Sequence, residues 1–279
     1  MEVIKARDVS PLGSQLVLVL GPPGIGKSTF AATVGEVVPP DEVLLITTLA
    51  REAKSWKYQE YNYDTIMVEE HEGWDPINKS YKVSGYDDLV KLLDELAKDT
   101  KYAAVILDNG TEAGEFAWHA ALAPLRIGDP NELGTGGNRF APYGSVRENM
   151  ENMVHRLSRL TGPHCARSKH VIVPWHVQPP KDDDDAQGIE YVGKELPMIR
   201  GSYRRRLGQK IDAITFMHRQ TKIVGKKKEM RYVLQVDSDM DRHTKIAGQV
   251  PEGVKYIEPS YDKLLQLIRE STELGVKDD

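Results

Sequence analysis

A glycine-rich turn between an apolar run and a helix-compatible segment most constrains what this chain can fold into. The run Leu16–Leu20 is apolar, and the turn after it fits the pattern G-x-x-x-x-G-K-[ST], with Gly21, Gly26, Lys27 and Ser28 in the fixed places. Glycines let the backbone approach a polyphosphate closely, and successive N–H groups then face the anion. The pattern therefore predicts a phosphate loop that follows a strand and opens a helix.

The residue types of the loop indicate their roles. Lys27 is expected to reach the β- and γ-phosphates of a nucleotide, and the Ser28 hydroxyl is expected to bind Mg²⁺. The predicted ATP-binding residues are Gly21, Pro22, Pro23, Gly24, Ile25, Gly26, Lys27, Ser28 and Thr29. The alternative is a strand-to-helix turn that binds nothing, and the complete pattern in the required context argues against it.

Length and composition fit a globular protein with one large α/β domain or two small ones. The chain has 279 residues, of which 40% are hydrophobic, and a formal net charge of −5. No apolar run approaches the roughly 18 residues of a membrane span, and the N-terminus lacks the apolar core of a signal peptide. We expect a cytoplasmic protein without a membrane partner. The predicted domain covers residues 1–279, with a lead-in at 1–14 and a tail at 271–279.

Hydrophobic patterning predicts an α/β fold. The predicted strands cover 15–20, 43–48, 64–68, 102–108, 170–176, 211–217, 230–236 and 254–257, and a basic turn is expected at 219–229. The predicted helices cover 27–37, 86–98, 111–123, 145–160 and 261–270. Strands alternate with helices until about residue 177, and a hairpin follows. This order predicts a mostly parallel central sheet with helices on both faces and a C-terminal antiparallel hairpin.

Two polar residues close predicted strands. Asp108 and His176 both end apolar runs, and the carboxyl ends of parallel strands lie at one edge of a sheet, beside the phosphate loop. Asp108 is predicted to hold Mg²⁺ directly or through water. His176 is predicted either to contact the γ-phosphate or to hydrogen-bond locally. Glu112 and Glu52 are the candidates for activating water.

Two loops of unusual length are expected at 126–144 and 178–200, and such loops are usually functional or disordered. The second contains Asp182–Asp185, which would repel phosphates. The run 200–210 is strongly basic and predicts either phosphate contacts or a solvated helix surface. Lys226–Lys228 is interpreted as a solubilising turn.

An aromatic cluster with interspersed lysines lies within residues 54–63. Its members are Trp56, Tyr58, Tyr61 and Tyr63, and Lys54 and Lys57 lie close to them in the sequence. Such a cluster either stacks nucleobases or forms a packed surface loop, and we favour the packed loop.

The order of these features resembles the RecA core, and most closely the short RecA-core recombination ATPases encoded by bacteriophages, a nucleotide-binding AAA-domain family. The resemblance covers roughly residues 14–270. Besides the phosphate loop, Asp108 and His176, it rests on Tyr143-Gly144 before a long helix and on Asp212 in a late strand. The resemblance implies a RecA-like, Mg²⁺-dependent ATPase that forms a ring or filament in the host-cell cytoplasm. The implied partners are single-stranded DNA and an annealing or single-strand-binding protein.

The resemblance also implies roles for basic residues. Met240-Asp241-Arg242 resembles a Lys-Asp-Arg segment of the family, so Arg242 is expected to be a charge-stabilising finger offered to a neighbouring subunit. The two long loops would face DNA. The candidate DNA-binding residues are Arg139 in the first loop and the arginines of the basic run at 200–210, namely Arg200, Arg204, Arg205 and Arg206.

The chain departs from the family after the second strand. Thr47, Thr48 and Leu49 stand where such proteins usually carry an acid that activates water. Two functions therefore stay open, a slow ATPase and an ATP-gated switch or clamp that recruits a protein partner with little turnover. A small-molecule kinase is a third possibility, but no second substrate-phosphate motif is evident.

Overall fold

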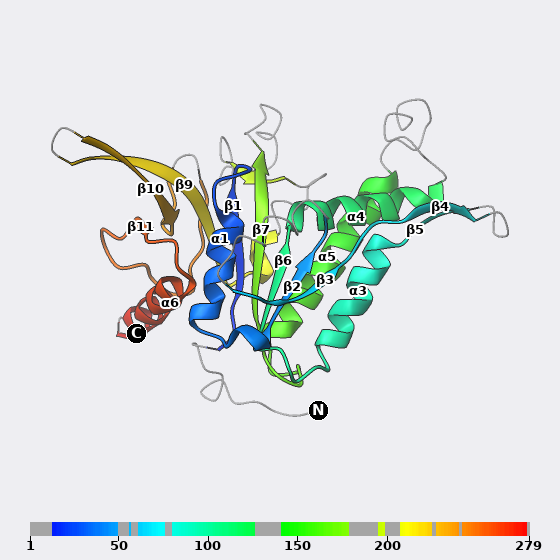
Figure 1. Ribbon diagram of the computed structural model, residues 1–279, viewed down its shortest axis with the longest axis horizontal. Coiled ribbons are helices and arrows are strands. Elements are labelled where there is room, and N and C mark those ends of the chain that lie inside the picture. The colour runs from blue at the N-terminus through cyan, green and yellow to red at the C-terminus, as the bar shows by residue number, and fades with distance from the viewer. Residues whose placement is uncertain are drawn as a thin grey trace.

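A mostly parallel sheet runs through the centre of the protein (Figure 1). The computed structural model describes residues 13–49, 56, 61–75, 80–125, 141–178, 195–198, 207–224, 227–239 and 242–277. Within them, the strands of the sheet are β1 (Leu16–Gly21), β2 (Val43–Thr47), β3 (Asp64–Met67), β6 (Ala104–Asp108), β7 (His170–Gln178), β8 (Leu196–Pro197), β9 (Ala213–Val224), β10 (Lys227–Gln235) and β11 (Tyr256–Ile257). Their order is β11-β10-β9-β1-β7-β6-β2-β3, with β8 beside β7.

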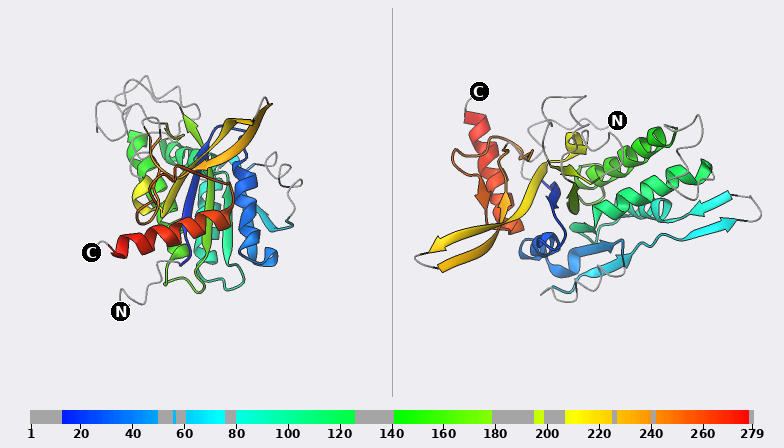
Figure 2. Two further views of the ribbon diagram at one scale, coloured as in Figure 1. Left: turned by 90° about the vertical axis from the view of Figure 1, so that its left-hand side faces the viewer. Right: turned by 90° about the horizontal axis from the view of Figure 1, so that it is seen from above.

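Helices cover both faces of this sheet (Figures 1 and 2). They are α1 (Lys27–Ala32), α3 (Gly85–Leu96), α4 (Gly110–Leu122), α5 (Ala141–Thr161) and α6 (Tyr261–Lys277). Short 3₁₀ helices lie at Thr33–Glu36, Pro40–Glu42, Ala123–Leu125 and Leu207–Lys210. The strands β4 (Glu72–Asp75) and β5 (Ser80–Val83) form a separate antiparallel pair. Among the described helices, none combines the length and the apolar content that crossing a membrane requires.

Alternation along the strands divides the core into two layers. Leu16, Leu18 and Leu20 of β1 pack toward α3, α4 and α5, whereas Val17 and Val19 pack toward α1 and α6. Successive side chains of a strand point to opposite faces, so a strand covered on both faces must be apolar throughout. The continuous apolar runs in the sequence have this origin.

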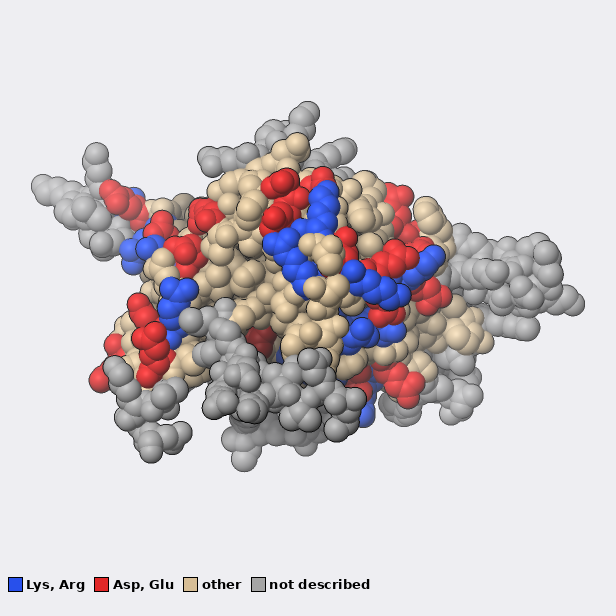
Figure 3. Space-filling model, turned by 90° about the horizontal axis from the view of Figure 1, so that it is seen from below, with Lys and Arg blue, Asp and Glu red and all other residues tan. Residues whose placement is uncertain are grey.

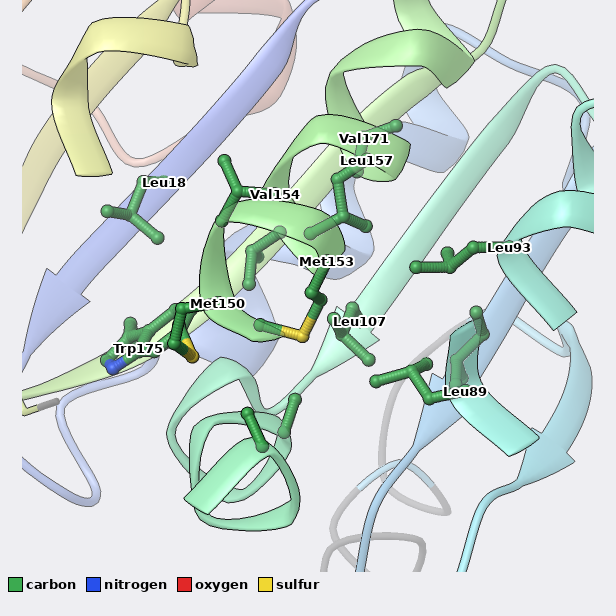
Figure 4. Close-up of a cluster of buried hydrophobic side chains, with 14 of the residues drawn as sticks. Leu18, Leu89, Leu93, Leu107, Met150, Met153, Val154, Leu157, Val171 and Trp175 are labelled. Carbon is green, nitrogen blue, oxygen red and sulfur yellow. The ribbon is translucent and has the colours of Figure 1, made fainter. Parts of the chain in front are cut away.

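The layer under α5 is filled by long, flexible side chains (Figure 4). Met150 and Met153 are fully buried and lie in one cluster with Leu107 of β6 and Trp175 of β7. An unbranched thioether adapts to irregular gaps in a core. The two methionines therefore serve as core residues and not as a binding surface.

The predicted fold class is confirmed, because β1, β2, β3, β6, β7 and β9 are mutually parallel and β10 and β11 add antiparallel strands at one side. One wrong prediction concerns the start of α5, which lies at Ala141 instead of Ser145. Tyr143 and Gly144 are thus in the helix and not in the loop before it. The ring of Tyr143 packs on that of Trp118, with centroids 5.4 Å apart, and this contact holds the first turn.

The basic turn predicted at 219–229 was wrong in most of its length. Residues 219–224 continue β9 and residues 227–229 begin β10, paired in register from Lys227 opposite Val224 onward. Thr221, Ile223 and Val224 are β-branched and favour extended backbone, which outweighs the local density of charge.

The end of α6 was also predicted too early. The helix continues to Lys277, so most of the expected tail at 271–279 is helical. The backbone N–H of Gln249 donates to the carbonyl oxygen of Ser271, whose side chain is fully buried. This contact with a distant segment is not visible in the local pattern.

A polar cluster joins the amino ends of β1 and β7 to α6. Nδ1 of His170 accepts a hydrogen bond from the hydroxyl of Tyr261 at 2.8 Å and lies 3.3 Å from the backbone nitrogen of Gln15. Burial lowers the pKa of His170 to about 4. The folded protein therefore holds this imidazole neutral at pH values where an exposed histidine is charged.

The neutral state of His170 predicts a pH-dependent stability. In the unfolded chain the pKa of this side chain returns to about 6.5, so below that pH the unfolded state binds more protons. The free energy of unfolding is therefore unaffected by this group above about pH 6.5. It decreases as the pH falls toward 4, by up to about 3 kcal/mol. Denaturant unfolding between pH 4 and 7 should show this slope, and His170→Gln should flatten it. The exposed His164→Gln is the control and should keep it; equal slopes in His170→Gln and wild type would contradict the assignment.

Candidate functional site

The phosphate loop Gly21–Ser28 connects β1 to α1 at the carboxyl edge of the sheet (Figure 1). Gly24 and Gly26 have φ angles of +72° and +100°, a region that glycine enters at little steric cost. A Cβ on Gly21 would lie 2.8 Å from the carbonyl oxygen of Met217 in β9. Gly24 and Gly26 are thus required by the turn itself, and Gly21 is required by the close approach of the neighbouring strand β9.

Lys27 lies inside this loop. Its side chain is 6% exposed, and Nζ donates to the carbonyl oxygens of Gly21 and Pro22 at 2.8 and 2.9 Å. Nζ also lies 3.0 Å from Nδ1 of His176, at the carboxyl part of β7. The loop therefore positions an ammonium group where a polyphosphate oxygen could replace a neutral carbonyl as its partner, and hydrogen bonds between charged groups are the stronger ones.

A hydroxyl, a carboxylate and an indole meet beside the lysine. Oδ2 of Asp108 accepts hydrogen bonds from the Ser28 hydroxyl at 2.8 Å and from Nε1 of Trp56 at 2.7 Å. Burial raises the pKa of Asp108, whereas these two hydrogen bonds and the charge of Lys27 lower it. The structure thus brings Lys27, Ser28, Asp108 and His176 together, as the strand-edge argument predicts.

The contact of Trp56 with Asp108 places this residue at the site, a role that the sequence did not indicate. The sequence left base stacking and a packed surface loop as alternatives. Packing is confirmed for Trp56 and Tyr63, which are 8% exposed and belong to the core with α1, but Trp56 is helical and not in a loop. Tyr61 stacks on Tyr63 with ring centroids 5.6 Å apart. Tyr58 lies outside the described residues. The aromatic density after β2 was the available signal, but nothing local indicated an indole–carboxylate contact.

The segment after Asp108 is tightly fixed. The Asp108–Asn109 peptide bond is cis, and the Asn109 side chain caps α4 by accepting from the backbone N–H of Glu112 at 2.8 Å. Gly110 lies against Trp175, so a Cβ at this position would collide with the indole ring. Glu112 therefore occupies the first turn of α4, close in sequence to Asp108, and its role in activating water stays a prediction.

The end of β2 is built from hydroxyl groups that serve the backbone. The Thr47 hydroxyl donates to the carbonyl oxygen of Leu49 at 3.1 Å, and Thr48 Oγ1 accepts from the backbone N–H of Asn109 at 3.1 Å. Both threonines are buried. In residues 43–49 no carboxylate follows the strand, and Glu52 lies outside the described residues.

His176 is held from both sides of its strand. Its backbone N–H donates to the hydroxyl of Thr111 at 2.9 Å, and its carbonyl oxygen accepts from the backbone N–H of Met198 at 2.8 Å. The imidazole contacts Lys27, so the residue lies at the phosphate loop as a γ-phosphate sensor must. The contact with phosphate itself stays a prediction.

Arg242 forms an ion pair within its own chain. Its Nε lies 2.8 Å from Oε2 of Glu195, and its backbone N–H donates to Oδ1 of Asp239 at 2.8 Å. The guanidinium also lies 6.0 Å from the ring centroid of Phe216. To act on a neighbouring subunit, Arg242 would have to leave Glu195.

Other predicted residues lie outside the described part of the chain. They are the DNA-binding candidates Arg139, Arg200, Arg204, Arg205 and Arg206, the acidic run Asp182–Asp185, and Met240-Asp241.

The donor set beside the loop fits Mg²⁺ with a nucleotide. Within the described ranges, no three His, Cys, Asp or Glu side chains group to hold a metal ion by themselves. Mg²⁺ at nucleotide sites usually takes one or two protein oxygens, with phosphates and water completing the shell. Ser28 and Asp108 supply a hydroxyl and a carboxylate 2.8 Å apart.

Comparison with protein families agrees with this site. Residues 14–246 match the family described as AAA domain. The chain belongs to the AAA domain family. No match was found among curated proteins.

Solved structures similar to this AAA domain protein share little sequence with it. The RadB recombinase is 13% identical with a TM-score of 0.42, covering 79% of this chain and 88% of that one. A KaiC-like protein from Pyrococcus horikoshii is 12% identical with a TM-score of 0.41, covering 80% and 79%. The type III secretion ATPase EscN from enteropathogenic E. coli is 13% identical with a TM-score of 0.41, covering 74% of this chain and 43% of that one.

The indole–carboxylate contact predicts an energetic coupling. Trp56→Phe should lower the free energy of unfolding by about 1.5–3 kcal/mol, because a hydrogen bond to a buried carboxylate is lost. In an Asp108→Ala background the same change should cost at least about 1 kcal/mol less, since the acceptor is already absent. Denaturant unfolding of wild type, both single variants and the double variant measures this difference. Strictly additive costs would contradict a direct contact.

Proposed function

We propose that this protein is a Mg²⁺-dependent ATPase that acts on single-stranded DNA in recombination or annealing, in the cytoplasm of a phage-infected or bacterial cell. The observation that carries the ATPase proposal is the cluster of Lys27, Ser28, Asp108 and His176 around the phosphate loop. Family membership supports nucleotide binding. The proposed DNA partner rests on the family resemblance of the sequence and on its basic residues.

The residues of the site have complementary tasks in this proposal. Lys27 places a positive charge where negative charge develops as the γ-phosphoryl group is transferred to water. Ser28 and Asp108 would hold Mg²⁺, which would neutralise negative charge on the nucleotide phosphates. His176 is anchored by its backbone and contacts Lys27, so the imidazole can respond to the occupancy of the loop.

Water activation is assigned to Glu112 or Glu52. Glu112 lies in the first turn of α4, beside the Asp108 end of β6. Because buried threonines occupy the place directly after β2, we expect slow hydrolysis.

An ATP-gated switch or clamp with little turnover is the second candidate. Two observations favour it, the hydroxyls at Thr47 and Thr48 and the retention of Arg242 by Glu195. In either case we propose a homo-oligomeric ring or filament, in which Arg242 of one subunit reaches the nucleotide of the next. An annealing or single-strand-binding protein is the proposed further partner.

The ATPase proposal predicts loss of turnover on removal of the ammonium group. Wild type should hydrolyse ATP, and faster with single-stranded DNA, whereas Lys27→Ala should lose at least about a hundredfold in rate because transition-state charge is left without its partner. A phosphate-release assay with and without DNA measures both effects, and the exposed Lys263→Ala serves as the control. Wild type that binds a fluorescent ATP analogue without hydrolysing it would reject the ATPase and leave the switch.

The basic run predicts salt-dependent DNA binding. Neutralising Arg204, Arg205 and Arg206 to Gln should weaken the affinity for single-stranded DNA and reduce the slope of log K against log salt by about 2, since each phosphate contact contributes about 0.7. Fluorescence anisotropy across a salt series measures this slope. An unchanged affinity would show that these arginines do not contact DNA.

A further inference from the structure

The strands β9 and β10 continue beyond the sheet as a two-stranded ribbon. β9 pairs with β1 over Ala213–Phe216, and β10 pairs with β11 at Leu234 and Gln235. In the described residues, 218–224 and 227–233 pair only with each other. Figures 1 and 2 show this ribbon projecting from the body of the protein. Two-stranded hairpins are marginally stable in water, so an exposed ribbon would gain from a partner.

The ribbon leaves the sheet at the nucleotide edge. β9 runs parallel to β1, with Phe216 opposite Leu20, so its continuation passes the phosphate loop. Met217, the first residue beyond this pairing, approaches Gly21 so closely that a Cβ on the glycine would lie 2.8 Å from its carbonyl oxygen. The ribbon and the loop are therefore direct neighbours along one strand.

Positive charge is concentrated in the ribbon. Residues 219–232 contain six Lys or Arg residues and one Glu, in a chain whose net charge is −5. Arg219, Lys228 and Arg231 are exposed. A segment of one sign on an otherwise acidic protein attracts a polyanion to that place.

The opposite edge of the sheet, at the amino ends of the strands, has a mixed distribution of charge. Figure 3 shows Lys and Arg interspersed with Asp and Glu on this face, without a large region of one sign. At the amino ends of the strands, Arg167 pairs with Glu42 and Lys101 pairs with Asp64. Charges neutralised in this way leave little attraction for a polyanion, so the ribbon stands out as a basic surface of the described residues.

One face of the ribbon combines cations with stacking groups. Tyr232 is 48% exposed and Met230 is 70% exposed, and alternation along β10 places both on the face of Lys228. Arg219 pairs with Tyr232 across the strands, and its guanidinium carbon lies 5.5 Å from the ring centroid. Tyr232 thus offers a half-exposed aromatic ring beside cations, with the Arg219 guanidinium over it. Aromatic rings beside cations bind single-stranded nucleic acid through base stacking and phosphate contacts.

We propose that the face of the β9–β10 ribbon formed by Arg219, Lys228, Met230 and Tyr232 binds single-stranded DNA. Arg219 and Lys228 contact phosphates, and a base stacks on Tyr232. The inference rests on the proposed function for the identity of the partner and adds a binding surface to it. It is independent of the arginines at 204–206.

Anisotropy with a labelled single strand of mixed sequence tests the ribbon. Arg219→Gln/Lys228→Gln should reduce the slope of log K against log salt by about 1.4. The matched exposed pair of Lys91→Gln on α3 and Lys98→Gln just after it (the α3 pair) should leave the slope unchanged. Tyr232→Ala should weaken binding at least about fivefold and Tyr232→Phe should retain it, because stacking needs the ring and not the hydroxyl. A duplex of the same sequence should bind less tightly, since its bases are not open to stacking.

The outcomes separate the ribbon from the rest of the proposal. Wild type that binds no DNA would overturn both the DNA-directed function and the ribbon. If wild type binds but the ribbon variants bind equally well, or the α3 pair loses as much, the ribbon assignment alone is wrong. If the ribbon variants keep DNA affinity but change the sedimentation behaviour of the protein, the face is a contact between copies and not a DNA site. Thermal unfolding confirms that each variant is folded.

Discussion

The hydrogen bond between the Ser28 hydroxyl and the buried carboxylate of Asp108 depends on the whole order of the sheet. The two residues are 80 positions apart and meet at 2.8 Å because β1 and β6 end at the same edge, one on each side of β7. Burying a carboxylate is unfavourable unless it is hydrogen-bonded. Trp56 and Lys27 supply the further compensation, and the two hydrophobic layers hold the strands in register beneath it.

Those parts of the site that follow from periodicity and from parallel topology could be predicted from the sequence. Continuous apolar runs identify strands buried on both faces, and the shared edge of parallel strands brings Asp108 and His176 to the phosphate loop. The contact of Trp56 with Asp108 and that of Arg242 with Glu195 could not be predicted. Each joins segments whose relative path is decided by packing of the whole chain, which leaves no signal at local spacing.

In the segment 219–229, backbone preference outweighs local charge in deciding the secondary structure. The lysines at 226–228 suggested a turn, yet pairing in register from Lys227 onward makes nearly the whole segment extended. Once the backbone is a ribbon, alternation sorts its side chains by face. Lys228 lies on the face of Met230 and Tyr232, opposite the strand that brings Arg219 to the same face, whereas Arg231 lies on the other face. The same residues therefore support different interpretations depending on the secondary structure that holds them.

Met217 connects the two proposed binding surfaces physically. Its carbonyl oxygen lies against Gly21, at the first residue of the phosphate loop, and the ribbon begins at the next position of the same strand. Closely packed atoms transmit strain, so a movement of Gly21 displaces Met217 as well. A shift of the phosphate loop around a nucleotide therefore either favours or opposes a shift of β9 caused by bound DNA. Coupling between two ligands is reciprocal in free energy. A DNA chain that alters ATP affinity through β9 must therefore itself bind more or less tightly, by the same factor, when ATP occupies the loop.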